Sequence, residues 1–211
     1  MEKLNWSSGL LNIKERLQTE LIRCSEKPFL IVIAGCTCSG KTFLAKELSE
    51  VLHPLVTPVI SIDDYYKDIR DQTLPRDENG HPLFNRPEAY RAEELSNDIS
   101  ELRRGRGIWT PKYDMKTNTY LDRKGAWINP SQVLIVEGLF ALQFLSSFTR
   151  QMKVYLDLDF DLALQRCIAR DTQRYQIDSA KISRVFSQKV WPDQLEFVVS
   201  QQKEADIIMY Q

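Results

Sequence analysis

A glycine-rich stretch at residues 35–42 constrains the fold of this chain more than any other feature. It reads Gly-Cys-Thr-Cys-Ser-Gly-Lys-Thr and matches the pattern G-x-x-x-x-G-K-T at every position. The apolar run 29–34 before it has the length of a buried strand, and residues 43–52 after it are apolar at helical spacing. A strand, a glycine loop and a helix in this order are the context that a phosphate-binding loop requires, whereas a chance glycine turn needs none of it.

The residue types in this loop suit a nucleoside triphosphate. The glycines let the backbone wrap a phosphate without Cβ clashes, and the loop N–H groups and the helix N-terminus point at the anion. We expect Lys41 to reach the β- and γ-phosphates and the Thr42 hydroxyl to ligate Mg²⁺. We therefore predict that ATP or GTP binds here with Mg²⁺. The residues expected to hold the nucleotide are Gly35, Cys36, Thr37, Cys38, Ser39, Gly40, Lys41 and Thr42.

Length and charge narrow the class of protein. With 211 residues, 43% of them hydrophobic, the chain has room for one domain with a buried core and a small insertion or lid. The formal net charge of −1 gives no electrostatic reason to expect a nucleic-acid or membrane partner. No apolar run approaches the roughly 20 residues that span a bilayer, and the N-terminus lacks an apolar signal core. We expect a cytoplasmic protein, and the sequence leaves a homo-oligomer open.

The cysteines suit reduced thiols better than a metal site or a disulfide framework. Cys36 and Cys38 both lie in the glycine-rich loop, where a disulfide between them would distort the backbone around the phosphate. A C-x-C pair with only His53 and His81 elsewhere is weak support for a zinc site. A redox-sensitive loop stays open, because a thiol at a helix N-terminus can have a lowered pKa. The other two cysteines are Cys24 and Cys167.

Strands and helices alternate along the rest of the chain. Further strands are predicted over residues 55–62, 133–136, 152–158 and 206–209, and helices over residues 41–52, 87–104, 139–147, 160–175 and 192–203, where Pro192 suits a first helical turn. This alternation predicts an α/β fold, a three-layer α/β/α sandwich around a five-stranded parallel sheet. Residues 4–24 predict an amphipathic helix that packs on the domain edge or binds a partner. We divide the chain into this N-terminal segment, 1–28, and a domain over residues 29–211.

Acidic residues follow the predicted strands, at the sheet edge where ligands of such folds bind. Glu137 follows four apolar residues and can hold Mg²⁺ there, although it could also cap the next helix. Asp63 and Asp64 follow the second strand, and a carboxylate at this point can accept the proton of an acceptor hydroxyl and also approach the metal. Because side chains alternate along a strand, only one of the two should face the site.

Two further segments carry candidate substrate-binding residues. The polar segment 64–130 contains aromatic residues with polar neighbours at 84–90 and 109–115, which suit a flat ring joined to a sugar. Residues 162–189 are basic and predict a helical lid that neutralises charge on a transferred phosphoryl group, unless they form an ordinary solvated face. The basic residues of this segment are Arg166, Arg170, Arg174, Lys181, Arg184 and Lys189.

Residues 29–209 resemble the uridine kinase family of P-loop nucleoside kinases, which is close to phosphoribulokinase. The resemblance rests on the loop 35–42 and on four other segments: 61–67 (Ser-Ile-Asp-Asp-Tyr-Tyr-Lys), 84–90 (Phe-Asn-Arg-Pro-Glu-Ala-Tyr) with Pro-Lys-Tyr-Asp at 111–114, Val-Glu-Gly at 136–138, and Ala-Asp-Ile-Ile at 205–208. It implies a P-loop NTPase fold and transfer of the γ-phosphoryl group of a nucleoside triphosphate to the 5′-hydroxyl of a ribonucleoside such as uridine or cytidine. The resemblance favours Asp63 over Asp64 as the general base.

The resemblance also implies roles for other residues. Lys41, Thr42 and Glu137 would hold the triphosphate and Mg²⁺, and Arg170 and Arg174 would be lid cations. The implied substrate-binding residues are Tyr65, Phe84, Asn85, Tyr113, Met115, Asn118 and Arg166.

Some residues depart from the family pattern, so the sequence leaves other acceptor molecules open. Asn85 stands where the family's uridine kinases carry an acid, Met115 where they carry an aromatic residue, and Asn118 at or near a histidine. Segments 77–80 (Asp-Glu-Asn-Gly), 174–176 (Arg-Tyr-Gln) and 190–192 (Val-Trp-Pro) are similar to nicotinamide riboside kinases instead. The alternatives are a kinase for nicotinamide riboside, pantothenate or a sugar phosphate, a non-catalytic nucleotide-binding switch, and a catalytically silent relative.

Overall fold

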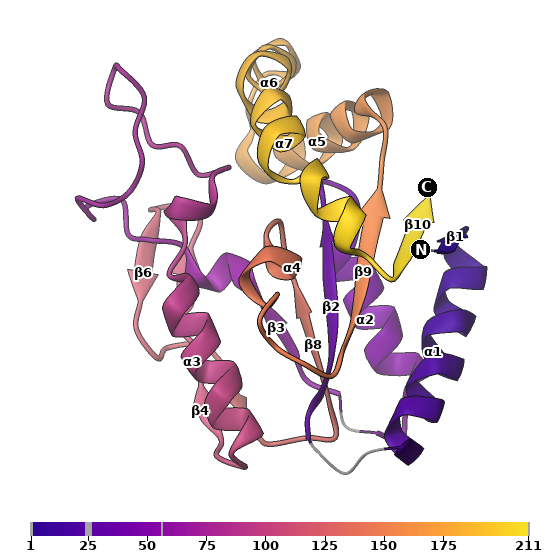
Figure 1. Ribbon diagram of the computed structural model, residues 1–211. Coiled ribbons are helices and arrows are strands. Elements are labelled where there is room, and N and C mark those ends of the chain that lie inside the picture. The colour runs from indigo at the N-terminus through magenta and orange to yellow at the C-terminus, as the bar shows by residue number, and fades with distance from the viewer. Residues whose placement is uncertain (1, 24–26, 56, 211) are drawn as a thin grey trace.

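A parallel sheet forms the centre of the computed structural model, which describes residues 2–23, 27–55 and 57–210 (Figure 1). Its six strands pair in one direction throughout. In the order in which they lie side by side, they are β1 (Glu2–Leu4), β10 (Ile207–Tyr210), β9 (Gln151–Asp157), β2 (Phe29–Gly35), β8 (Val133–Glu137) and β3 (Val59–Ser61).

The predicted α/β fold is confirmed, but the sheet has six strands where five were expected. The additional strand is β1, which pairs with β10 through the register of Glu2 with Ile207. Three residues are too few to show a strand pattern, and β1 exists only because β10 offers a free edge. The predicted strand 55–62 is also shorter, because Leu55 closes the turn after α2 and Pro58 lacks an N–H; Val56 lies outside the described residues.

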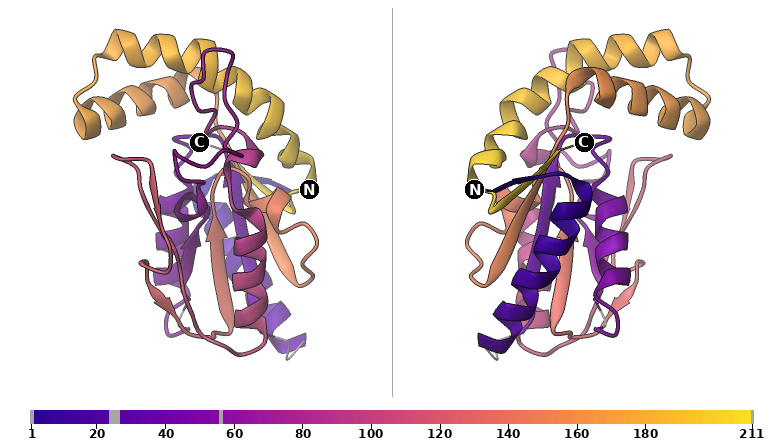
Figure 2. Two further views of the ribbon diagram at one scale, coloured as in Figure 1. Left: turned by 90° about the vertical axis from the view of Figure 1, so that its left-hand side faces the viewer. Right: turned by 90° about the vertical axis from the view of Figure 1, so that its right-hand side faces the viewer.

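Helices cover both faces of the sheet, as Figure 2 shows. In β2, Leu30 and Val32 point into one apolar core, while Ile31 and Ile33 point into the other. The first core is closed by α3 (Ala92–Arg103), α4 (Ala141–Phe144) and the turn Val199–Glu204. The second is closed by α1 (Trp6–Arg23) and α2 (Lys41–Val51).

The N-terminal helix α1 packs against the sheet, which is the first of the two expectations for it. Ile13 and Leu17 are fully buried in the second core. The Trp6 indole N–H also donates a hydrogen bond of 2.7 Å to Glu47 of α2. The helix thus contributes to the same core as α2.

Three predicted helices differ in their bounds. The helix expected over 87–104 begins at Ala92, because Pro87–Ala89 form a single 3₁₀ turn and Tyr90 then pairs in extended conformation with Tyr66. The helix expected over 139–147 is only α4. The helix expected over 192–203 divides into α7 (Trp191–Phe197), with Pro192 in its first turn as predicted, and the 3₁₀ segment Val199–Glu204.

Residues 64–130, called the insertion below, hold more regular structure than one helix. Besides α3 they form two small antiparallel sheets of two strands each, and the second of them is a hairpin. Strand β4 (Ile108–Trp109) pairs with β7 (Trp127–Ile128), and β5 (Lys112–Asp114) pairs with β6 (Thr119–Leu121). The second aromatic segment, 109–115, thus lies largely in strands β4 and β5.

Three helices after β9 lie beyond the carboxyl ends of the central strands (Figure 1). They are α5 (Phe160–Tyr175), α6 (Ser179–Val185) and α7, with a π turn at Phe186–Val190 between the last two. We refer to them as the lid helices. Asp159 and Asp178 cap α5 and α6 through hydrogen bonds to backbone N–H groups. None of the helices in the described ranges is both long and apolar enough to cross a membrane.

Candidate functional site

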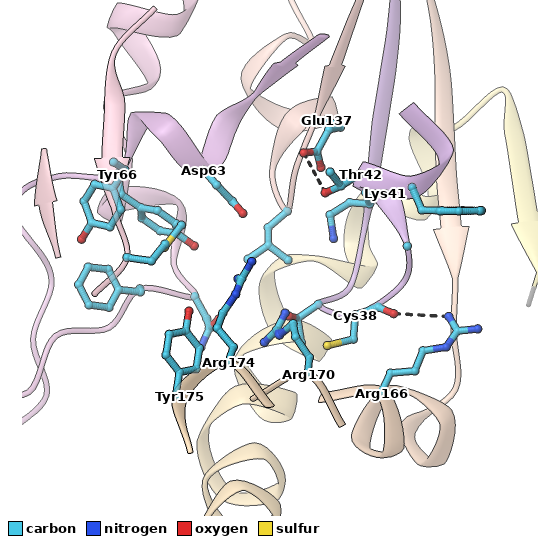
Figure 3. A pocket seen from close by; sticks show the side chains of 18 of the residues that line it. Cys38, Lys41, Thr42, Asp63, Tyr66, Glu137, Arg166, Arg170, Arg174 and Tyr175 are labelled. Atoms are coloured by element: carbon cyan, nitrogen blue, oxygen red, sulfur yellow. Dashed lines mark hydrogen bonds between the residues drawn. The ribbon is translucent and has the colours of Figure 1, made fainter. Parts of the chain in front are cut away.

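The glycine-rich loop, the insertion and the lid helices enclose one cavity of about 680 Å³ (Figure 3). Most of the residues predicted from the sequence line it. From the loop and the strand ends these are Thr37, Cys38, Gly40, Lys41, Thr42, Asp63 and Glu137; from the insertion Phe84, Asn85, Tyr113, Met115 and Asn118; and from α5 Arg166, Arg170 and Arg174. Gly35, Cys36, Ser39 and Tyr65 do not belong to its lining.

The backbone of the loop takes conformations that glycine favours. A Cβ at Gly35, whose φ is 150°, would lie 2.6 Å from the carbonyl oxygen of Leu156 in β9. Cys38 and Gly40 have left-handed φ angles of 62° and 84°. Gly35 therefore lies against β9, while Thr37, Cys38 and Gly40 of the same loop line the cavity.

The ends of β2 and β8 place two polar side chains of α2 beside a buried acid. Lys41 is 9% exposed, and its Nζ donates a 2.8 Å hydrogen bond to the carbonyl of Cys36 in its own loop. The Thr42 hydroxyl donates to Glu137 Oε1 at 3.2 Å, and Glu137 is 2% exposed. An incoming phosphate oxygen can replace the Cys36 carbonyl as the partner of the Lys41 ammonium.

The described part of the chain contains no group of three or more His, Cys, Asp or Glu side chains arranged to hold a metal ion. A hydroxyl beside one carboxylate, as at Thr42 and Glu137, suits an ion that takes its remaining ligands from phosphate and water. Mg²⁺ is such an ion, so the donor set here fits it. It does not fit zinc, and neither does the loop's C-x-C pair.

Asp63 lies on a 3₁₀ turn, Ile62–Tyr65, and not on the strand itself. Gly138 lets the end of β8 approach this turn, because a Cβ there would collide with the Ile62 side chain. Burial, and then the nearby Glu137, raise the pKa of Asp63 to about 6, while Lys41 acts in the opposite direction. A carboxylate with a pKa close to neutrality is well suited to accept a proton.

As expected, only one of the two adjacent aspartates faces the cavity. Asp64 accepts a hydrogen bond of 3.1 Å from the backbone N–H of Tyr113 and lies 3.4 Å from the ammonium of Lys112. It therefore fixes hairpin β5–β6 to the turn that carries Asp63.

Aromatic residues form one wall of the cavity, and their positions correct one prediction. Tyr65 was expected to bind substrate, but it is 1% exposed and its hydroxyl donates to Asp98 of α3 at 2.8 Å. Successive side chains of a 3₁₀ turn point about 120° apart, so the next residue, Tyr66, faces the cavity instead. The Tyr66 ring lies 5.5 Å from Phe84 and 5.3 Å from Tyr113 between centroids. The pair of adjacent tyrosines in the sequence was a signal for one such residue, but not for which.

Tyr113 presents a buried hydroxyl at the cavity wall. The residue is 4% exposed, and its Oη has no hydrogen-bond partner among the residues the structure describes. Burial raises the pKa of this phenol to about 12, so it stays protonated near neutral pH. A buried hydroxyl without a partner costs free energy unless a ligand supplies the hydrogen bond.

Three arginines of α5 reach the cavity from the lid side. Arg166 donates to the carbonyl oxygen of Cys38 at 3.4 Å, so it lies against the phosphate-binding loop. Arg170 is held by Asp171, to which its Nε donates at 2.6 Å. Arg174 extends into the cavity (Figure 3), with its guanidinium carbon 5.9 Å from the ring centroid of Tyr175.

The loop cysteines point in different directions and are not joined to each other. Cys36 is buried, with its Sγ 3.8 Å from the hydroxyl of Tyr155. Cys38 packs into the small lid core with Cys167 of α5. A hydrogen bond with the Cys167 thiol lowers the pKa of Cys38 to about 7. Cys24 lies outside the described residues.

Comparison of the sequence with known proteins finds relatives in a single family. A sequence profile of the Phosphoribulokinase / Uridine kinase family matches residues 30–211. The chain is 31% identical to a uridine kinase of Staphylococcus aureus, over 85% of this chain and 86% of that protein. It is 33% identical to the uridine kinase-like protein 3 of Arabidopsis thaliana, over 87% of this chain but only 39% of that protein, so it spans about two fifths of this plant relative's length.

Solved structures show the same fold at lower identity. The D-glycerate 3-kinase of Cryptococcus neoformans var. grubii superposes with a TM-score of 0.63 at 16% identity, covering 88% of this chain and 87% of that one. At this identity the likeness supports the arrangement of the sheet and helices, and nothing about the acceptor.

Proposed function

The chain belongs to the phosphoribulokinase and uridine kinase family, and we propose that it transfers the γ-phosphoryl group of ATP or GTP to the 5′-hydroxyl of a ribonucleoside. One observation carries this proposal: a single cavity joins a phosphate-binding loop to an aromatic wall. In Figure 3, Asp63 lies between Tyr66 on the aromatic side and Lys41 on the loop side.

The loop side is built for the phosphates of the donor. Backbone N–H groups at the start of α2 and the Lys41 ammonium supply positive potential. Thr42 and Glu137 would hold Mg²⁺, which neutralises charge on the phosphates when it is bound. The cavity-lining arginines Arg170 and Arg174 add positive charge from the lid side, where the transferred group would carry its negative charge.

The aromatic side is suited to a base joined to a ribose. Tyr66, Phe84 and Tyr113 form a wall against which a flat ring can lie, and the Tyr113 hydroxyl offers a hydrogen bond to it. The amide of Asn85 can donate to and accept from a sugar diol. Met115 and Asn118 complete the edge of this pocket.

The reaction then needs one proton acceptor. The 5′-hydroxyl oxygen forms a bond to the γ-phosphorus and loses its proton to the Asp63 carboxylate. The bond between that phosphorus and the bridging oxygen breaks, and the nucleoside diphosphate leaves with the electron pair. The insertion 64–130 would provide the acceptor pocket, and residues 162–189 would act as the lid.

A uridine- or cytidine-like acceptor is favoured because the S. aureus and Arabidopsis relatives are named as uridine kinases or uridine kinase-like proteins. The test is a panel assay for ADP release with Mg·ATP. The panel holds uridine, cytidine, adenosine, guanosine and nicotinamide riboside, with pantothenate and ribulose 5-phosphate as outgroups. We expect turnover on a pyrimidine ribonucleoside. Turnover only on an outgroup would overturn the acceptor class, and nucleotide binding without turnover on any compound would favour the switch module.

A further inference from the structure

Helix α7 of the lid contacts both sides of the cavity through two consecutive residues. Gln194 is fully buried, and its Oε1 accepts a 2.7 Å hydrogen bond from the backbone N–H of Thr37. Thr37 belongs to the phosphate-binding loop and lines the cavity. Through Gln194, therefore, the lid is joined to the donor side by a short hydrogen bond between a buried amide and the loop backbone.

The preceding residue, Asp193, contacts the acceptor side. Its Oδ1 lies 3.6 Å from Nη2 of Arg86. The Arg86 guanidinium also lies over the ring of Phe197, 5.1 Å from its centroid, one helical turn further along α7. Arg86 directly follows Phe84 and Asn85, which line the cavity. The contacts of Arg86 with Asp193 and Phe197 thereby link the cavity wall at residues 84–85 to the lid helices.

The two contacted segments border the same small cavity beneath the lid helices. Thr37 and Asn85 both line a second, smaller cavity of about 220 Å³, together with residues of α5 and α6 such as Arg170 and Ile182. A movement of α7 would carry Thr37 and Arg86 with it, because each is bound to one of two neighbouring residues on the same helix.

The amide of Gln194 is not explained by packing alone. Its Nε2 is buried and has no hydrogen-bond partner within the described residues. A buried amide with one unsatisfied end destabilises the fold relative to an apolar side chain of the same size. Its retention is understandable if the Oε1 end serves to hold the loop.

We propose that Asp193 and Gln194 are positioning residues that keep the acceptor segment 84–86 in register with the phosphate-binding loop. Nucleotide binding at the loop then orders the acceptor wall, so the two substrates bind with positive coupling. The statement about two substrates rests on the proposed kinase function, whereas the link between loop and wall does not.

At nearly constant volume, the variant Gln194→Met removes the hydrogen bond from Thr37, and Asp193→Asn removes the negative charge that faces Arg86. Their controls are Gln202→Met, a glutamine whose amide donates to Asp157 away from the cavity, and Glu196→Gln, which removes an exposed carboxylate from the same helix. Thermal unfolding of all four variants establishes that each one folds.

Hydrogen–deuterium exchange of the peptide that contains residues 84–86 is then measured with and without a non-hydrolysable Mg·ATP analogue. We expect the analogue to slow exchange at least threefold in the unsubstituted protein and in both controls, and less than 1.5-fold in Gln194→Met and Asp193→Asn. Slowing that persists in these two variants, or that is absent from the unsubstituted protein, would overturn the proposal. This readout needs no acceptor, so it decides the link even if no nucleoside is phosphorylated.

A second readout concerns the reaction itself. At saturating nucleotide we expect kcat/KM for the acceptor to fall roughly fivefold to 20-fold in Gln194→Met, while the Kd of the nucleotide changes less than threefold. Equal losses for both substrates would indicate a general structural defect and contradict a positioning role.

Discussion

The two sides of the cavity are built in different ways. The donor side consists of backbone and of side chains at the ends of neighbouring strands: β2 and β8 pair in register, so that Ile33 lies opposite Glu137, and the loop follows β2 directly. The acceptor side consists of side chains carried by a 3₁₀ turn, an irregular segment and a two-stranded hairpin. The donor side is thus fixed by the sheet, whereas the acceptor side is fixed by contacts among side chains.

This difference explains why a short sequence motif indicates the chemistry of the donor side, whereas no short motif identifies the acceptor. A phosphate is recognised by backbone N–H groups, whose positions follow from the local chain. Under the proposed function, a base and a sugar would be recognised by side chains such as Tyr66 and Tyr113, whose positions depend on partners far away in the sequence. Tyr66 is held by stacking on Tyr90, with a ring-centroid distance of 4.1 Å.

The largest effect is expected from the donor side. Lys41→Ala should lower turnover by roughly 10²- to 10³-fold, because the ammonium that neutralises phosphate charge is lost. It should also abolish the rise in melting temperature on addition of Mg·ATP, measured by differential scanning fluorimetry. Lys46→Ala, which removes an exposed lysine of the same helix, is the control and should leave both unchanged. An undiminished thermal shift in Lys41→Ala would refute the assignment of the donor side.

The next largest loss of activity is expected at Asp63, which lies between the two sides of the cavity. Asp63→Asn should lower kcat at least about 100-fold while the Kd for Mg·ATP, measured by calorimetry, stays within about threefold, because the proton acceptor is lost and the phosphate contacts remain. Asp64→Asn keeps the hydrogen bond from the Tyr113 backbone and should lose less than about fivefold. Equal kcat values for Asp63→Asn and the unsubstituted protein would remove Asp63 from the role of base.

A chemical probe can sharpen where the nucleotide lies. Cys38 lines the cavity and has a pKa lowered to about 7. Its alkylation rate by iodoacetamide should therefore rise through pH 7 as the thiolate forms, and saturating Mg·ATP should slow it at least about tenfold. The rate is followed by mass spectrometry, with Cys38→Ser as the control. Alkylation of Cys38 that Mg·ATP does not slow would place the nucleotide elsewhere.

The smallest effect is expected on the acceptor side. Tyr113→Phe removes one hydroxyl and should raise the acceptor KM roughly threefold to tenfold, with the ATP KM within twofold, because one hydrogen bond to the acceptor is lost. Steady-state kinetics measures both constants. Tyr120→Phe is a matched control, since that hydroxyl donates to Glu94 outside the cavity. A rise in the ATP KM alone would break the division into two sides.

Much of the fold follows from local patterns. The loop motif, the strands β2, β8, β9 and β10, and α5 lie where the sequence predicts them, because each has a clear apolar run, a periodicity or a specific residue order. The strand β1 and the start of α3 were not predictable in this way. The first depends on the free edge of β10, and the second on the pairing of Tyr90 with Tyr66.

The residues of the candidate site also divide into those that a local sequence pattern predicts and those that it does not. The rule for parallel sheets placed Glu137 and the pair Asp63 and Asp64 at the cavity, and the family resemblance then favoured Asp63 over Asp64. The resemblance implied Tyr65, whereas the 3₁₀ turn Ile62–Tyr65 buries Tyr65 and leaves the next residue, Tyr66, at the cavity. The contact between Gln194 and Thr37 joins residues 157 positions apart, and no local sequence pattern predicts it.

The central claim is that the γ-phosphoryl group is transferred to the 5′-hydroxyl of a ribonucleoside. The most direct measurement is ³¹P NMR of a reaction that contains the protein, Mg·ATP and uridine or cytidine, followed by mass spectrometry of the products. We expect ADP and a nucleoside 5′-monophosphate in equal amounts, with no signal from orthophosphate. ATP converted to ADP and orthophosphate, or a phosphate ester at another hydroxyl, would contradict it.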